Sequence, residues 1–461
     1  STGEFLENRG TKVDTHVHLI AFGYLALMLA LVQPWVRLSE RARRRLAWLL
    51  VSGAVLLPVG VFLIHYVGLA YSPLQAIGWA SIFADLGGLI VLAATVGYLS
   101  GIVQHFRARQ PLLPDKLLGD RSSSSRGLLA GGLLLILAGF VHGAYYAGAD
   151  LYRHEAADYT ILSQMSSAAA AQNQAQINQS LADYGQLQGD KTVKIAAHAH
   201  IIEFGLLAML LAFFQPYVQL SEAWKLRWAM VLLCGSLLLP VCVLMEMKFG
   251  LLAGGIADIG GLLVILALFA MWIGILRYTG SLDAMPLKTP SGAPSEGQRK
   301  MSARQMLLFG GVALAILGMS YGLWYAIFAE HQALDGIGHS LASGFQAVAE
   351  RNSGERENSL LQYRQAKYAY DRQVDVHGHW IGLAMLLIVL AIAFDHVGLT
   401  EKIKLLLAGT LLLGAALFPL GVLLQTWSHG ALPRAVAILG SALVIAALTG
   451  VVTGFLRRQD A

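Results

Sequence analysis

Histidines recur in pairs of the form His-x-His at three places in the chain. The pairs are His16 and His18, His198 and His200, and His377 and His379. Each pair lies at the beginning of a long apolar stretch, where an ionisable residue is costly and therefore indicates function. Because imidazole ligates haem iron, copper and zinc, the pattern predicts a haem or metal centre. One isolated pair would more often be structural, but three pairs at equivalent positions favour ligation.

The spacing within each pair restricts the kind of centre. Residues i and i+2 of a helix point about 200° apart, so the two imidazoles of one pair serve two different neighbours. In a closed ring of three such helices, each helix has a neighbour on either side, and up to three sites can form. Two imidazoles that face each other across a flat gap suit a bis-histidine haem, whereas a bare metal needs further ligands.

The elements that carry the histidines belong to a membrane protein. Of the 461 residues, 56% are hydrophobic and only 13% are charged, about half the charge of a soluble domain. We therefore exclude a soluble enzyme, a disordered protein and a nucleic-acid partner, and expect contact with a lipid bilayer. Eleven stretches are long enough to cross it; they are residues 15–36, 46–68, 76–104, 127–150, 197–219, 227–249, 251–277, 304–328, 376–396, 402–425 and 433–456.

Lysine and arginine in the short loops predict the orientation. Basic clusters within 37–45 and 107–126 fall on one side of the membrane, which we take as cytoplasmic. The two long polar segments, 151–195 and 329–375, then lie outside together with the His-x-His ends of the spans. We expect an integral protein of the bacterial inner membrane with these parts on the periplasmic side.

Several motifs repeat at fixed offsets, 182 residues from the first copy to the second and 179 from the second to the third. The triplets are His16, His198 and His377; Glu40, Glu222 and Glu401; and Pro58, Pro240 and Pro419. The fold prediction is therefore an all-α polytopic protein of three pseudo-symmetric four-helix repeats, 1–110, 111–290 and 291–461. The first repeat has only three spans, so we expect that an opening helix or signal is removed or absent from this numbering.

Three arcs of four helices, with histidines at the outer ends of what would be the second, sixth and tenth helices, resemble subunit I of the haem-copper oxidase and nitric oxide reductase superfamily. The resemblance implies a low-spin haem b between two of these helices, and its cyclic extension implies two further facing pairs. The pairs are His16 with His379, His200 with His377, and His18 with His198. The span 227–249 corresponds to the family's seventh helix but contains no histidine, so the chain departs there from the oxidase pattern.

A non-haem copper or iron ion is a second candidate cofactor. In the family, the first histidine of the tenth-helix pair binds a high-spin haem that lies opposite a non-haem metal, and nitric oxide reductases bind this metal partly through a carboxylate. By this resemblance, His377 and His200 with Glu246 form a conceivable metal site. The alternative for Glu246 is an ordinary charge at the membrane interface.

Four further residues are candidates for supporting roles. Asp85 and Asp258 lie beside Gly-Gly within spans, where each either accepts the free N–H of a ligating histidine or bonds a neighbouring helix. His65 and His429 lie near outer helix ends and could be extra ligands or partners of haem propionates. Each of these two histidines is alone more commonly structural.

The leading interpretation is a membrane-embedded b-type haem protein that transfers electrons in a respiratory-type complex, with one to three haems. Its partners would be a periplasmic cytochrome or another redox subunit, and quinone. We expect an electron-transfer subunit of an oxidoreductase rather than a complete terminal oxidase. Two alternatives remain: a reductase of nitric oxide or a similar small oxidant, and a transporter that handles copper or another metal.

Overall fold

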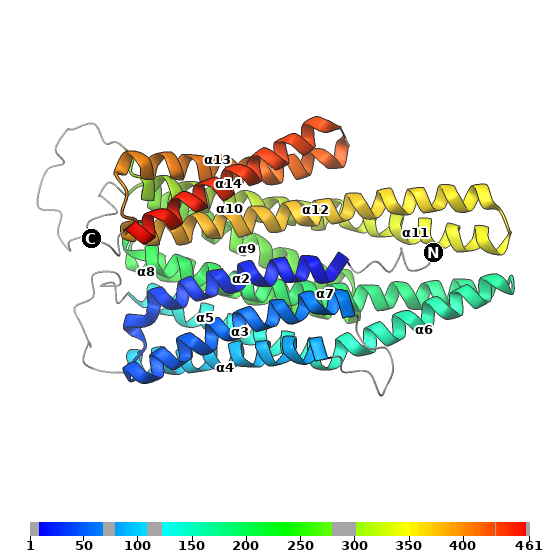
Figure 1. Cartoon of the computed structure of the whole chain (residues 1–461), viewed down its shortest axis with the longest axis horizontal. Helices are drawn as coiled ribbons and strands as arrows, with labels where there is room; N and C mark the ends of the chain where they lie inside the picture. The colour runs from blue at the N-terminus through cyan, green and yellow to red at the C-terminus, as the bar shows by residue number, and fades with distance from the viewer. Residues whose placement is uncertain (1–8, 68–78, 108–121, 279–300, 429, 458–461) are drawn as a thin grey trace, which may run out of the picture.

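The chain is an array of long helices. The structure, a computed structural model, describes residues 9–67, 79–107, 122–278, 301–428 and 430–457, and within these ranges it contains no strand (Figure 1). Eleven of the described helices are long and apolar enough to cross a membrane, as an integral membrane protein requires. The prediction of an all-α protein with about eleven membrane-spanning helices is confirmed.

The membrane-spanning helices agree with the predicted spans except at two outer ends. They are α2 (Arg9–Val32), α3 (Glu40–Val67), α4 (Trp79–Arg107), α5 (Ser123–Tyr145), α7 (Gln174–Phe214), α8 (Glu222–Phe249), α9 (Leu251–Leu276), α10 (Ala303–Phe328), α12 (Ser353–Ala393), α13 (Glu401–Trp427) and α14 (Ala431–Arg457). Helices α7 and α12 have 41 residues each and begin more than twenty residues before the predicted spans. Their outer parts are polar, so hydropathy could not detect them.

The helices that carry the His-x-His pairs end in the same way. α2, α7 and α12 each run into one short 3₁₀ turn: η1 (Gln33–Trp35), η3 (Gln215–Tyr217) and η4 (Phe394–His396). Just after each turn, a backbone N–H donates to a glycine carbonyl of another helix. The bonds are Arg37 to Gly101 at 3.0 Å, Gln219 to Gly274 at 2.9 Å and Gly398 to Gly454 at 2.9 Å. Each bond holds the chain reversal that leads into the next membrane helix.

That next helix forms a tight antiparallel pair with its successor. The pairs are α3 with α4, α8 with α9, and α13 with α14. Glycine makes the close approach possible: a Cβ atom at Gly87 or Gly260 would lie within 3.0 Å of the backbone of Leu57 or Leu239. The Gly-Gly motifs of the sequence therefore serve helix–helix packing.

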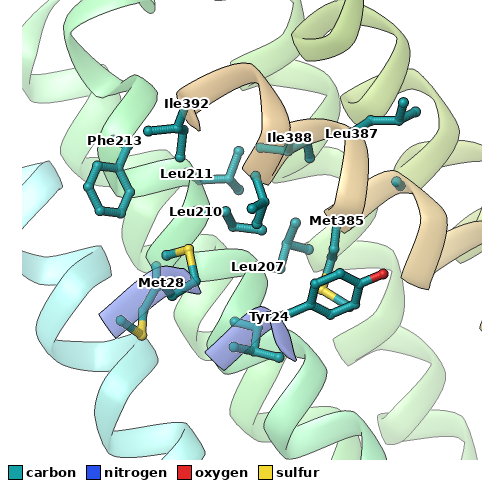
Figure 2. Packing of buried hydrophobic residues seen from close by; sticks show 14 of the residues in the cluster. Tyr24, Met28, Leu207, Leu210, Leu211, Phe213, Met385, Leu387, Ile388 and Ile392 are labelled. Carbon is teal, nitrogen blue, oxygen red and sulfur yellow. The ribbon is translucent and has the colours of Figure 1, made fainter. Parts of the chain in front are cut away.

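The three His-x-His helices form the centre of the bundle. α2, α7 and α12 contact one another pairwise, and their buried side chains interdigitate, as Figure 2 shows for Tyr24, Leu207 and Met385. The Tyr24 hydroxyl of α2 donates to the Gly382 carbonyl of α12 at 2.8 Å. The three His-x-His pairs therefore lie on helices that contact one another.

The two long polar segments are helical hairpins that project beyond the other helices (Figure 1). α6 (Leu151–Ala170) pairs with the outer part of α7, and α11 (Glu330–Ala349) with the outer part of α12. The hairpin tips pack on each other through Ala168, Ile177 and Ala349. The Gln172 amide also donates to the Ala349 carbonyl at 2.9 Å, so the hairpins brace one another.

Candidate functional site

Two pairs of imidazoles meet between the central helices, and a third pair interacts through electrostatics. The ring centroids of His16 and His379 are 6.3 Å apart with 36° between the ring planes. Those of His200 and His377 are 6.0 Å apart at 66°. His18 lies near enough to His198 for an electrostatic interaction between the two rings. Each His-x-His helix therefore points its two histidines at different neighbours.

These separations fit an iron ion bound between two imidazoles. A metal ion held at about 2.0 Å by two ring nitrogens, each about 1.1 Å from its own centroid, separates the centroids by roughly 6.2 Å when the rings face each other. The two observed distances are therefore compatible with one iron ion between facing imidazoles.

In two of these histidines, a hydrogen bond at one ring nitrogen determines which nitrogen has a free lone pair. Nδ1 of His198 lies 2.9 Å from the Gly139 carbonyl, and Nδ1 of His377 lies 2.9 Å from the Gly318 carbonyl. A carbonyl oxygen only accepts, so Nδ1 must carry the proton and a neutral ring keeps its Nε2 lone pair free. This is the arrangement in which a protein orients a metal-ligating histidine.

The same arrangement occurs within α12. Nδ1 of His379 lies 2.6 Å from the carbonyl of Asp375, one turn earlier on the helix. The bond again requires a proton on Nδ1 and leaves Nε2 without one in the neutral ring. Backbone carbonyls thus hold three of the six imidazoles at Nδ1, and this type of partner is not revealed by residue types in the sequence.

Two glycines make room for the imidazoles themselves. Gly143 of α5 packs against the His198 ring and Gly322 of α10 packs against the His377 ring. At either position an added Cβ atom would lie closer than 3.0 Å to ring atoms. Because ring atoms in a packed interior cannot yield freely, glycine is the residue that allows the observed ring position.

His200 differs from the other three imidazoles of α7 and α12. Its Nδ1 is buried and has no hydrogen-bond partner among the described residues. Its ring stacks on Phe204 with centroids 5.7 Å apart. Glu203 follows within one turn, and its carboxyl group lies near enough to Tyr24 for an electrostatic interaction. Among the four imidazoles of α7 and α12, His200 is therefore the one whose tautomer is not fixed by a hydrogen bond at Nδ1.

A network of charged side chains lies at the base of the α6–α7 hairpin. The Lys194 ammonium lies 2.9 Å from the Asp150 carboxylate and donates to the Asp190 carboxylate at 2.7 Å. His154 bonds Asp190 at 2.8 Å. Burial alone would raise the pKa of Asp190, but the hydrogen bonds from Lys194 and His154 outweigh it and lower that pKa.

His142 connects the charge network to the imidazoles. Its ring centroid lies 6.3 Å from that of His198, and its Nε2 lies 3.1 Å from the Lys194 carbonyl. The repeat pattern does not single out His142, because Tyr321 stands at the equivalent position 179 residues later. It does not single out Glu203 either, whose equivalents are Ala21 and Gly382.

The weaker candidates lie apart from the His-x-His rings or outside what can be described. Glu246 and Asp258 interact electrostatically with His331 of α11. Within the described residues, Asp85 makes no hydrogen bond to a His-x-His ring, and backbone carbonyls bond Nδ1 of His198 and His377. The His65 side chain and all of His429 lie outside the described parts of the chain.

No preformed site for a bare metal ion is present in the described ranges: no group of three or more His, Cys, Asp or Glu side chains is arranged to hold one. His200, His377 and Glu246 therefore do not form a three-ligand group as they stand. Comparison with known protein families, curated proteins and solved structures found no match to the chain.

Proposed function

We propose that the chain is a membrane-embedded haem protein that transfers electrons, with b-type haem held between histidines of adjacent central helices. The observation that carries the proposal is the pairing of imidazoles at 6.3 and 6.0 Å, with Nδ1 bonded to backbone carbonyls. The ligands would be His16 with His379, His200 with His377, and His18 with His198. When bound, haem with both axial positions filled supplies one-electron chemistry and leaves no open position on the iron.

The residues of the chain would determine how such a group is held. Backbone carbonyls keep the ligating rings of His198, His377 and His379 in one tautomer and one orientation, which raises the basicity of Nε2. The apolar side chains below the rings exclude water from the centre of the bundle. Burial and axial ligation then tune the reduction potential.

The proposal includes a threefold repeat and an orientation. The recurring 3₁₀ turns and the glycine-carbonyl bonds that follow them support three copies of one four-helix unit. The basic segment 37–45 lies at the end of the bundle opposite the hairpins (Figure 1), which supports a periplasmic location for the hairpins in a bacterial inner membrane. A periplasmic cytochrome or another redox subunit would then exchange electrons at the hairpin end, and quinone is a further candidate partner.

Haem content of the purified protein tests the proposal. We expect protohaem in the pyridine haemochrome assay, iron in matching amount and a reduced-minus-oxidised α-band. His379→Ala should lower the haem-to-protein ratio, whereas His339→Ala, on the outer hairpin, should leave it unchanged. Protein without protohaem, or equal haem in both variants, contradicts the proposal. Copper in stoichiometric amount without iron would instead favour a metal-handling transporter.

One observation favours a second candidate, a reductase of nitric oxide or a similar small oxidant. His200 alone among the four histidines of α7 and α12 lacks a bond at Nδ1, and Glu203 lies within one turn of it. A less constrained imidazole suits a site whose ligation changes during a reaction. Binding of carbon monoxide to the reduced protein would support this candidate, and a spectrum unaffected by carbon monoxide would contradict it.

A further inference from the structure

The end of α3 opposite the hairpins carries a basic stripe, formed by Arg41, Arg44 and Arg45, for which the described chain provides no ion-pair partner. A surface groove runs along one face of the helix, lined by Arg41, Arg44, Arg45, Trp48, Leu49 and Ser52. Arg43, on a different face, pairs with Glu40 and bonds the Gln33 carbonyl. Among the described residues, the three arginines of the groove form no ion pair, and all three are exposed.

The position of these arginines is unfavourable without an anion. They lie in the first two turns of α3, where the helix dipole is positive and repels cations. Three guanidinium groups thus meet in one groove at the membrane boundary, and a phosphate group is the anion that arginine binds best in two-point contacts.

The remainder of the stripe is apolar and faces outward from the bundle. Trp48 is 65% exposed and Val55, two turns further along α3, is 55% exposed. Tryptophan at this depth is typical of the membrane interface. Going from the helix end toward the membrane centre, the surface passes from arginines to tryptophan to aliphatic side chains, which is the order of headgroup, interface and acyl chain in a lipid.

We propose that Arg41, Arg44 and Arg45 with Trp48 form a binding site for one anionic phospholipid of the leaflet at this end of the bundle. The arginines bind the headgroup phosphate, and the acyl chain lies along Trp48 and Val55. Charge complementarity selects this occupant, since a zwitterionic lipid brings a cation to three arginines. The site does not depend on haem.

The corresponding face of α8 provides an internal comparison. With the 182-residue offset, the equivalents of the three arginines are Ala223, Leu226 and Arg227, and Met230 replaces the tryptophan. Arg227 lies over the Trp224 ring at 4.9 Å. The α8 face lacks the cluster, so the site is not repeated on α8.

The test uses the full chain in phosphatidylcholine vesicles with brominated phosphatidylglycerol or brominated phosphatidylcholine, which quench nearby tryptophan. The signal of Trp48 is the difference between the wild type and Trp48→Phe. We expect phosphatidylglycerol to be preferred over phosphatidylcholine roughly 5-fold or more at Trp48. One basic residue at a membrane surface contributes about 1 kcal/mol of attraction to an anionic lipid, which corresponds to roughly this factor. The triple variant R41Q/R44Q/R45Q should abolish the preference, and Arg227→Gln should preserve it.

Equal quenching by the two lipids in the wild type overturns the proposal, as does an undiminished preference in the triple variant. Displacement of the lipid by excess inorganic phosphate would identify a free-phosphate site and also overturn it. If the triple variant does not fold by circular dichroism, Arg44→Gln alone should lower the preference several-fold. Because no readout involves haem, failure of this proposal is distinguishable from failure of the electron-transfer proposal.

Discussion

A single methyl group at Gly322 should displace the His377 imidazole. The Cβ atom of Gly322→Ala would lie closer than 3.0 Å to the ring, so the ring must rotate and lose the 2.9 Å bond from Nδ1 to the Gly318 carbonyl. Overpacking costs about 1–3 kcal/mol and the lost hydrogen bond about 0.5–1.5 kcal/mol. The better helix propensity of alanine returns about 1 kcal/mol. The net destabilisation is about 0.5–3.5 kcal/mol.

The substitution should also weaken ligand binding. Loss of the group that orients a ligating histidine typically weakens metal binding about 10- to 100-fold. The assays are thermal unfolding and the haem-to-protein ratio of the purified variant. Gly409→Ala is the matched control, because its Cβ would meet its nearest atom, Met306 Sδ, at 3.8 Å. If Gly322→Ala keeps the unfolding temperature and the haem content of Gly409→Ala, the packing argument is refuted.

Three further outcomes follow from groups outside the membrane spans. Lys194→Met leaves the buried Asp150 carboxylate without its 2.9 Å partner. Denaturant unfolding should show a loss of about 1–3 kcal/mol in the free energy of unfolding, a range that allows for the partial exposure of the lysine. Ile177→Ala, fully buried at the hairpin tips, should cost about 2–5 kcal/mol and raise hydrogen exchange there while leaving the visible spectrum unchanged. Burial raises the pKa of Glu330, and the nearby Glu246 carboxylate raises it further. The folded state therefore binds this proton more tightly than the unfolded state does. The free energy of unfolding should fall as pH rises through and above the ordinary glutamate range. Glu330→Gln should remove that slope, and an identical slope in the variant would contradict the assignment.

The membrane helices could be predicted from the sequence because apolar length is a strong signal. The polar outer parts of α7 and α12 could not, because they continue the same helices in water and their stability comes from packing against α6 and α11. The distinct neighbours of the two histidines in each pair followed from helix geometry alone. That part of the candidate site needed only the 3.6-residue repeat.

The backbone carbonyls that orient the imidazoles could not be read directly from the sequence. Asp258 had two predicted roles, as the acceptor of a histidine N–H or in a bond to a neighbouring helix. The carbonyls of Gly139 and Gly318 bond the His198 and His377 rings, and a carbonyl has no residue type that a sequence displays. The signal was nevertheless present in the repeated glycines Gly143 and Gly322. Their common offset of 179 residues is the offset of the histidines they contact.

The central claim is that imidazoles from neighbouring helices fill both axial positions of a haem iron. Low-temperature electron paramagnetic resonance of the oxidised full-length protein, together with its near-infrared magnetic circular dichroism, reports the axial ligands directly. The account predicts low-spin ferric haem with bis-imidazole ligation, lost in part in His379→Ala. Only high-spin haem, ligation by another residue type, or no haem signal would contradict it.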